Sequence, residues 1–266
     1  MKGRTIVLDH IGEIEAAAYL IDGKLDDILI DDIDAPRPGA IYRGICDRPI
    51  KGQGGMMLRL PEGETAFLRH GKGLSPGQPL LVQVTGHAEG GKAVPVTDRV
   101  LFKSRYAIVT PGKPGLNISR QITDEDTRDA LLAIAHQVFD STHGLILRSS
   151  CEGADEAEIA DDIEAMLTMA DAVLADADGT TPEALTEGDG PHTVAWREWT
   201  GRADVVTEAG SLAHLGILDQ FAAIGDDMVP LGEGYMYVEP TRALVAVDVN
   251  TGNDTSPAAA LKANIA

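Results

Sequence analysis

A run of short apolar segments separated by glycine and proline constrains the fold more than any other feature of this sequence. Five such segments follow one another between Ile41 and Val100: IYRGIC, GGMMLRL, TAFLRHG, PLLVQVTGH and KAVPVTDRV. Runs of this length bounded by Gly and Pro are typical of β-strands joined by turns. Five strands in so short a stretch predict a small β-barrel.

The charge distribution bears on what such a barrel binds. The oligonucleotide-binding barrel has this size and strand count. The whole chain carries a net charge of −20, but residues 40–122 hold 12 Lys and Arg against 5 Asp and Glu, a local +7. The remainder, with 10 basic and 37 acidic residues, carries −27. A cationic segment in an anionic chain gives a polyanion one place to dock. A solvated basic surface on an acidic, salt-adapted protein is the alternative, and charge alone does not separate the two.

On both sides of this segment the pattern is mixed α/β. Strands are predicted at 4–9, 13–21, 25–30, 106–111, 144–150 and 203–208, and helices at 123–138, 155–176 and 211–224. Asp22-Gly23 is a hairpin signal, and the Pro- and Gly-rich residues 34–40 indicate a linker into the barrel. Thr123 is placed to cap the first helix. The Gly-, Asp- and Pro-rich residues 177–192 indicate a mobile loop.

The segment ALVAVDVNTG, residues 243–252, places two polar side chains at the end of an apolar run. The run predicts a buried strand that forms a hairpin with residues 234–240. Asp248 and Asn250 share one face because side chains alternate along a strand. This oxygen-rich pair suits a hard cation, or it is an Asx turn that ends the strand. Spacing alone favours the turn.

Several classes of protein do not fit the sequence. No apolar run reaches the roughly 18 residues of a membrane span, and the N-terminal residues lack the apolar stretch of a signal peptide. Cys46 and Cys151 are too few for a disulfide framework or a zinc knuckle. We therefore expect a cytoplasmic protein. A final helix begins at Ser256-Pro257 and has no stop signal before Ala266. We expect that the sequence is cut inside this helix or that a partner segment is missing.

The order of parts, with GLILRSS in the α/β segment and TRALVAVDVNTG before LKANIA, resembles the catalytic half of the ribonuclease E/G family. These are bacterial endoribonucleases of RNA decay and rRNA processing. The resemblance is strongest at TRALVAVDVN and GLILR and weak across the barrel. It implies an α/β fold in which an RNase H-like domain is interrupted by an oligonucleotide-binding (OB) barrel and a 5′-sensor, before a DNase I-like subdomain begins. The implied divisions are 1–38 and 201–230 (RNase H-like), 39–102 (barrel), 103–200 (sensor-like) and 231–266 (start of the DNase I-like part).

The resemblance also assigns roles to the terminal motif. It implies that Asp248 binds a catalytic Mg²⁺ and that Asn250 assists. The family's second metal-binding Asp would follow the final helix, beyond Ala266. Asp254 is a weak substitute for it. We therefore expect an incomplete catalytic unit that binds RNA and cleaves it poorly.

Five further residues match family positions that contact RNA. Arg148 and Ser149 match an Arg-Thr pair that reads a 5′-monophosphate, and an Arg paired with a nearby carboxylate is the alternative. Phe67 matches an aromatic on which a base stacks, although a lone Phe in a barrel is more often core. A second stacking aromatic is replaced near Met56-Met57. Lys92 and Arg120 match RNA-contacting cations, and for Arg120 a solvated turn residue is the alternative.

The resulting hypothesis is a Mg²⁺-dependent endoribonuclease that acts on single-stranded RNA. A non-catalytic RNA-binding protein is the first alternative, and an acidic protein-interaction scaffold is the second. The Cys pair that links protomers through zinc in longer family members would also lie beyond Ala266. We therefore expect a monomer or a weak homodimer that does not associate with membranes.

Overall fold

The computed structural model describes residues 2–50, 52, 54–88, 91–139, 142–232, 234–253 and 256–265. They form two compact units, which we call the larger unit (Met1–Ala209) and the smaller unit (Gly210–Ala266). Within the described residues, no helix is long and apolar enough to cross a membrane.

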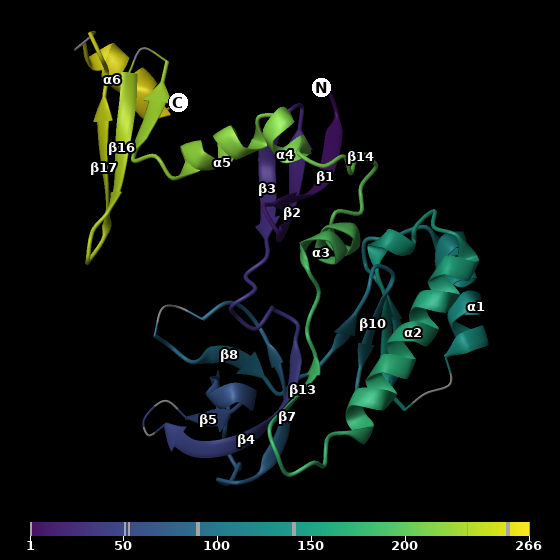
Figure 1. Cartoon of the computed structure of the whole chain (residues 1–266). Coiled ribbons are helices and arrows are strands. Elements are labelled where there is room, and N and C mark those ends of the chain that lie inside the picture. The colour runs from purple at the N-terminus through teal and green to yellow at the C-terminus, as the bar shows by residue number, and fades with distance from the viewer. Residues whose placement is uncertain are drawn as a thin grey trace. The chain divides into compact units, whose positions relative to one another are not determined.

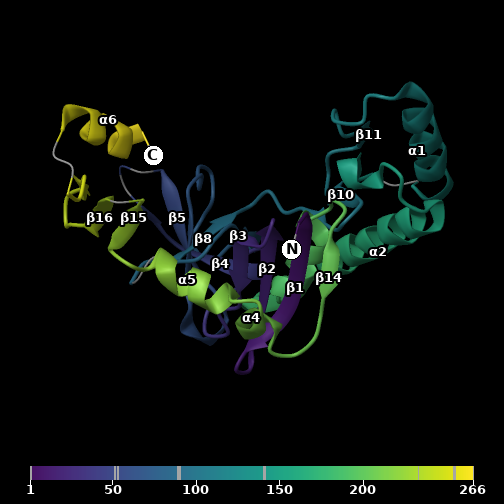
Figure 2. The same cartoon turned by 90° about the horizontal axis from the view of Figure 1, so that it is seen from above.

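The larger unit begins with an antiparallel meander of three strands. These are β1 (Arg4–Ile11), β2 (Ile14–Ile21) and β3 (Lys24–Ile30), and β14 (Asp204–Val206) joins the outer side of β1 in parallel (Figure 2). Asp22 and Gly23 both have positive φ, 52° and 80°. Two successive left-handed residues match the twist of a tight hairpin, so the predicted turn is confirmed.

The predicted barrel is also confirmed. Its strands are β4 (Ile41–Ile50), β5 (Gly55–Arg59), β6 (Thr65–Leu68), β7 (Pro79–Val84) and β8 (Val94–Thr97), with the short 3-10 helix η1 (Pro61–Gly63) between β5 and β6. The order β4-β5-β6-β8-β7 closes through pairing of β4 with β7. The interior is filled by small and aliphatic side chains: Cys46, Met56, Leu58, Leu60, Ala66, Leu68, Val82, Val84, Val94 and Val96.

A second α/β layer follows the barrel. Strands β9 (Phe102–Lys103), β10 (Ala107–Thr110), β11 (Gly115–Ile118) and β12 (Gly144–Leu147) form a sheet in the order β11-β12-β10-β9. Helix α2 (Glu156–Ala175) lies against β10 and beside α1 (Glu125–Val138) (Figure 1). Leu145 and Leu147 of the sheet and Ile159 and Ile163 of α2 belong to one buried core.

Helix α3 (Pro191–Glu198) is fixed to the first sheet. The backbone N–H of His192 donates to Glu15 Oε1 at 2.7 Å. The His192 ring Nε2 lies 2.9 Å from the carbonyl of Asp9 and 3.0 Å from that of Ala16. Just beyond the helix, Trp199 stacks on Tyr19 with ring centroids 5.3 Å apart.

The smaller unit holds α4 (Ser211–His214), α5 (Ile217–Ile224), a sheet of β15 (Met228–Leu231), β16 (Gly234–Pro240) and β17 (Val245–Asn250), and α6 (Pro257–Ile265). The sheet is antiparallel in the order β15-β16-β17. Ser256 Oγ accepts from the Ala259 N–H at 3.2 Å, as expected of an N-cap.

The structure corrects the predicted loop at 177–192. This segment contains β13 (Glu183–Thr186), which pairs with β4 on the outside of the barrel, and the start of α3. Arg43 of β4, only 5% exposed, holds the segment in place. Its guanidinium donates to the carbonyls of Thr181 and Asp176 and pairs with the carboxylate of Glu183.

Three local predictions were also wrong. Asp124 rather than Thr123 caps α1, because its carboxylate accepts from the Thr127 N–H at 2.8 Å. The helix predicted at 211–224 is broken into α4 and α5 where Gly216 adopts a φ of 67°. The strand of the terminal motif is not buried: the side chains of Leu244, Val245 and Val247 are 60%, 61% and 59% exposed.

Candidate nucleic-acid interface

The outer face of the barrel carries an apolar row across three strands. On β6, Ala66 and Leu68 point into the barrel, so Phe67 between them points outward. In the strand register, Phe67 lies opposite Met57 of β5 and opposite Pro95 of β8. All three side chains are half-buried. Phe67 is therefore not part of the barrel core, and we call Met57, Phe67 and Pro95 the outer row.

The backbone of β5 makes room for the Phe67 ring. A Cβ placed on Gly55 would lie 2.3 Å from the ring atom Cε2 of Phe67. Only glycine allows this approach, because any side chain would displace the ring. Of the two residues near which the resemblance places the missing aromatic, Met56 is 1% exposed and fills the barrel interior, whereas Met57 lies in the outer row.

Cations flank the outer row. Arg59 points to the same face as Met57, two residues along β5, and Arg69 is exposed just after β6. Lys92 is exposed two residues before β8. Arg120 lies elsewhere, in the exposed turn that follows β11. The structure thus places Phe67 and Lys92 on the barrel and Arg120 on the neighbouring sheet.

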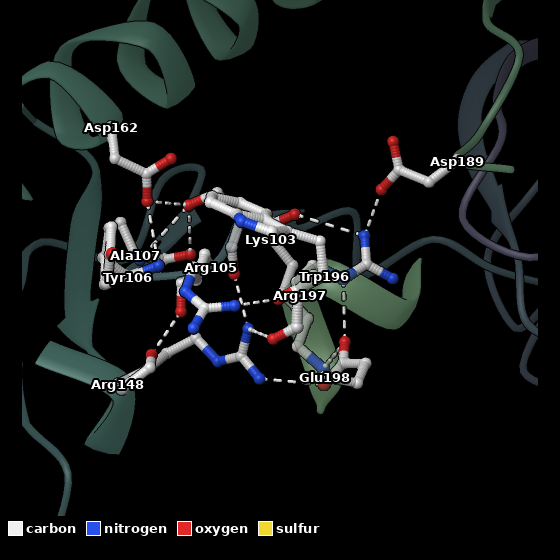
Figure 3. Close-up of polar contacts among 12 residues, drawn as sticks. Lys103, Arg105, Tyr106, Ala107, Arg148, Asp162, Asp189, Trp196, Arg197 and Glu198 are labelled. Carbon is white, nitrogen blue, oxygen red and sulfur yellow. Dashed lines mark hydrogen bonds and ion pairs between the residues drawn. The ribbon is translucent and has the colours of Figure 1, made fainter. Parts of the chain in front are cut away.

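Four charged residues meet between β12 and α3, and we call them the Glu198 cluster: Lys103, Arg148, Arg197 and Glu198 (Figure 3). Arg148 Nη2 donates to Glu198 Oε2 at 2.8 Å, and its Nη1 donates to the carbonyl of Ser104 at 2.5 Å. Lys103 Nζ and Arg197 Nε each lie 2.7 Å from Glu198 Oε1. Arg197 also pairs with Asp189.

The three cations determine the ionisation of Glu198. Burial alone would raise the pKa of this carboxyl, but hydrogen bonds from Lys103 and Arg197 and the charge of Arg148 outweigh burial and lower its pKa to about 2. Glu198 is therefore a fixed anion at neutral pH.

The Glu198 cluster bears directly on the Arg148 prediction. The Arg148 side chain is only 16% exposed and is paired with a carboxylate, the arrangement that the alternative interpretation describes. Ser149 follows as the first residue of the short 3-10 helix η2 (Ser149–Cys151). A phosphate that reached Arg148 would have to displace Glu198.

An exposed tryptophan lies beside the Glu198 cluster. Trp196 of α3 is 51% exposed, and the guanidinium of Arg105 lies 4.8 Å above the centre of its ring. Sequence reasoning missed Trp196 and Glu198 because they lie just beyond residues 177–192, which were predicted to be a loop, and no helix was predicted there. The tetrapeptide WREW at 196–199, with two aromatics around an Arg-Glu pair, was the available signal.

A cleft of about 550 Å³ connects the barrel with this region. Its walls include Gln83 and Thr97 of the barrel and Met166 and Met169 of α2. Lys103 and Arg197 of the Glu198 cluster line one end, and Arg99 is a further cation. The cleft thus brings residues of the barrel, of α2 and of the Glu198 cluster together, and its lining contains apolar, cationic and acidic side chains.

In the smaller unit, Asp248 and Asn250 share one face of β17, as predicted. Asn250 Nδ2 donates to Asp248 Oδ2 at 3.0 Å. Asp248 lies within β17, and Asn250 is its last residue. Asp254 lies outside the described residues. Across the described part of the chain, no group of three or more His, Cys, Asp or Glu side chains is placed to hold a metal ion. One carboxylate and one amide do not complete a magnesium site.

The fold is that of a mixed α/β protein built around a closed, OB-like barrel. Residues 102–203, which include Arg120, Arg148 and the Glu198 cluster, match the sequence profile of the Ribonuclease E/G family. The chain is 30% identical to Ribonuclease E of Nostoc sp. over 224 residues, which cover 70% of this chain and 32% of that protein. It is 25% identical to Ribonuclease G of Escherichia coli K12 over 300 residues, which cover 88% of this chain and 60% of that protein.

These matches show that the chain belongs to the ribonuclease E/G family. Ribonuclease E of Synechocystis sp. is similar as well, at 28% identity over 70% of this chain and 33% of that protein. The chain thus spans about a third of the ribonuclease E relatives and 60% of the ribonuclease G relative.

Proposed function

We propose that this chain binds single-stranded RNA and takes part in its endonucleolytic cleavage in RNA decay and rRNA processing. The observation that carries the proposal is the outer row on a closed OB-like barrel, flanked by exposed cations. A base stacks on an aromatic face whatever its sequence, and cations neutralise the backbone beside it. Membership of the ribonuclease E/G family supports RNA as the polyanion.

The proposed roles of individual residues follow from their positions. Phe67 stacks a base, and Lys92 and Arg120 contact phosphates. Arg148 and Ser149 bind a 5′-terminal phosphate, which displaces the Glu198 carboxylate from Arg148. A guanidinium suits that group, because a terminal phosphate carries more charge than a bridging one.

We propose the same division of the chain that the resemblance implies. The sheet β14-β1-β2-β3 corresponds to the RNase H-like part, and the sheet β15-β16-β17 begins the DNase I-like subdomain. The protein acts in the cytoplasm as a monomer or weak homodimer. The buried, unpaired thiols of Cys46 and Cys151 suit that reducing compartment.

The metal chemistry that we propose centres on Asp248 and Asn250 of β17. Mg²⁺ would supply charge stabilisation and an activated water. Asp248 is its proposed ligand, with Asn250 orienting the carboxylate through the bond at 3.0 Å. The second candidate is a non-catalytic RNA-binding protein, in which the bond between Asn250 and Asp248 only stabilises the strand.

The test of RNA binding is a titration of a labelled single-stranded oligomer with the 266-residue chain and its Phe67→Ala variant. We expect a loss of affinity corresponding to about 1–3 kcal/mol, the contribution of one stacked base. Phe221→Ala is the matched control, because Phe221 is exposed but lies in the smaller unit. Equal affinities of parent and Phe67→Ala would contradict the proposed surface.

A further inference from the structure

We infer that Tyr235 and Tyr237 form a stacking site for a nucleobase of single-stranded RNA, directly beside Asp248 and Asn250. This inference rests on the proposed function and deepens it. It assigns a positioning role to two tyrosines that neither the sequence motifs nor the comparisons single out.

The strand register carries the inference. Tyr237 lies directly opposite Asp248, and Tyr235 lies directly opposite Asn250. Opposite residues in an antiparallel pair place their side chains on the same face, with Cβ atoms about 4.5–5.5 Å apart. The two tyrosine rings therefore lie next to the Asp248–Asn250 pair.

The third strand extends this face. Met228 of β15 lies opposite Tyr237, and Pro230 lies opposite Tyr235. One half of the face is thus apolar and aromatic, while the other half ends in a carboxylate and an amide. The two tyrosine rings meet edge to face, with centroids 5.7 Å apart and an interplanar angle of 82°.

This face is accessible. Tyr237 is 39% exposed, Met228 is 47% exposed, and Asp248 is an exposed residue of β17. Aromatic residues make up only 4% of the chain, and two of its five tyrosines lie on this face. A flat apolar surface next to polar groups is suited to a nucleotide, whose base is flat and whose sugar and phosphate are polar.

Charge indicates which part of the nucleotide is bound. The carboxylate of Asp248 repels a phosphate in the absence of a cation, so the attraction comes from the base. A base held on Tyr237 positions its own backbone beside Asp248 and Asn250. The tyrosines would therefore set which phosphodiester lies at that pair, without demanding a particular base.

The structural alternative is that the two tyrosines only stabilise the sheet through contacts with their neighbours on β15 and β17. Photocrosslinking separates the two possibilities, because it reports contact with the RNA itself. A single-stranded RNA carrying 5-iodouridine is irradiated with the 266-residue chain, and the crosslinked residue is identified by mass spectrometry. We expect crosslinks to Tyr237 or Tyr235, in addition to any at Phe67.

Variants provide the second measurement. Tyr237→Phe keeps the ring and should bind RNA like the parent, whereas Tyr237→Leu should weaken binding at least about fivefold, the lower limit for one stacked base. Thermal melting followed by circular dichroism verifies that each variant is folded. If Tyr237→Leu does not fold, crosslinking of the parent chain still shows whether the tyrosines contact the RNA.

The outcomes separate this inference from the proposed function. RNA binding with crosslinks at Phe67 but none at either tyrosine, or with unchanged affinity of a folded Tyr237→Leu, overturns the inference and leaves the proposed function standing. No RNA binding by the parent chain overturns both.

Discussion

Glu198 is the residue at which the charges of the larger unit converge. Three cations from three separate segments contact its carboxylate: Lys103 from β9, Arg148 from the end of β12 and Arg197 from α3. Removing the carboxylate would leave these partly buried cations facing one another. Their repulsion, together with lost hydrogen bonds, is the main cost we expect at this site.

The first prediction concerns Glu198→Gln and pH. The carboxyl has a pKa of about 2 in the folded chain against an ordinary 4.5. Because the folded pKa is lowered, the stabilisation is fully present above about pH 4.5 and is lost as the pH falls toward 2. At pH 7 the variant should be less stable by about 1–2 kcal/mol, after allowance for solvent screening.

Urea unfolding at pH 7, 4 and 3 measures this effect. The stability difference between parent and variant should shrink as the pH falls. Glu156→Gln, at an acidic position in the exposed first turn of α2, is the control. A difference that stays constant with pH would show that Glu198 does not ionise as described.

At the scale of elements, α3 joins two sheets of the larger unit. Its first turn is bonded to the first sheet through His192, and its last turn contributes Arg197 and Glu198 to the cluster beside β12. A ligand that broke the ion pair between Arg148 and Glu198 would therefore remove one of the contacts that hold α3 beside β12.

The second prediction follows from the competition for Arg148. A 5′-monophosphorylated oligomer should bind more tightly than its 5′-hydroxyl counterpart. Glu198→Gln should widen this preference because the competing charge is gone, and Arg148→Ala should erase it. Fluorescence anisotropy with the two oligomers measures this preference for the parent, Glu198→Gln and Arg148→Ala. If the parent and Glu198→Gln each bind the 5′-monophosphorylated and the 5′-hydroxyl oligomer with equal affinity, there is no terminal-phosphate site at Arg148.

Elements with strong local signals could be predicted from the sequence. The Gly and Pro between strands 41–100 specify turns, and Asp22-Gly23 specifies a hairpin, so the barrel and the first meander were recognised. Strand β13 could not be predicted, because residues 177–192 around it have the composition of a loop. Its pairing depends on β4 and Arg43, which are remote in the chain.

In the candidate site too, features that follow from local sequence patterns could be predicted, and features that depend on distant residues could not. The shared face of Asp248 and Asn250 follows from the two-residue period of a strand, which is a local rule. The pairing of Arg148 with Glu198 joins residues 50 apart, and no local pattern indicates it. The exposure of Val245 and Val247 was missed because an apolar run does not reveal what covers it.

At the scale of the whole molecule, basic and acidic residues are unevenly distributed along the chain. The barrel and the neighbouring sheet carry the +7 of residues 40–122 in a chain of net charge −20. Arg43 and Lys103 are used in ion pairs within the larger unit, whereas Arg59, Arg69, Lys92 and Arg120 are exposed. The electrostatic part of RNA binding should therefore come mainly from this region, and the affinity should depend strongly on salt.

The third prediction concerns cleavage by the 266-residue chain. With one carboxylate at the Asp248–Asn250 pair, Mg²⁺ should be held weakly, and a labelled single-stranded RNA in millimolar Mg²⁺ should be cleaved slowly or not at all. Asp248→Ala is the comparison. Clear cleavage by the parent that is lost in Asp248→Ala would contradict this prediction and show that another carboxylate completes the site.

The salt dependence of RNA binding tests the central claim, that single-stranded RNA binds the cationic surface of the larger unit. Affinity is measured over a range of salt concentrations for the parent and for the double variant Lys92→Ala, Arg120→Ala. Each lost phosphate contact should reduce the slope of log affinity against log salt by about 0.7. The account predicts weaker binding and a slope that is shallower by about 1.4 in the double variant. An unchanged slope, or a parent chain that does not bind RNA at low salt, would contradict it.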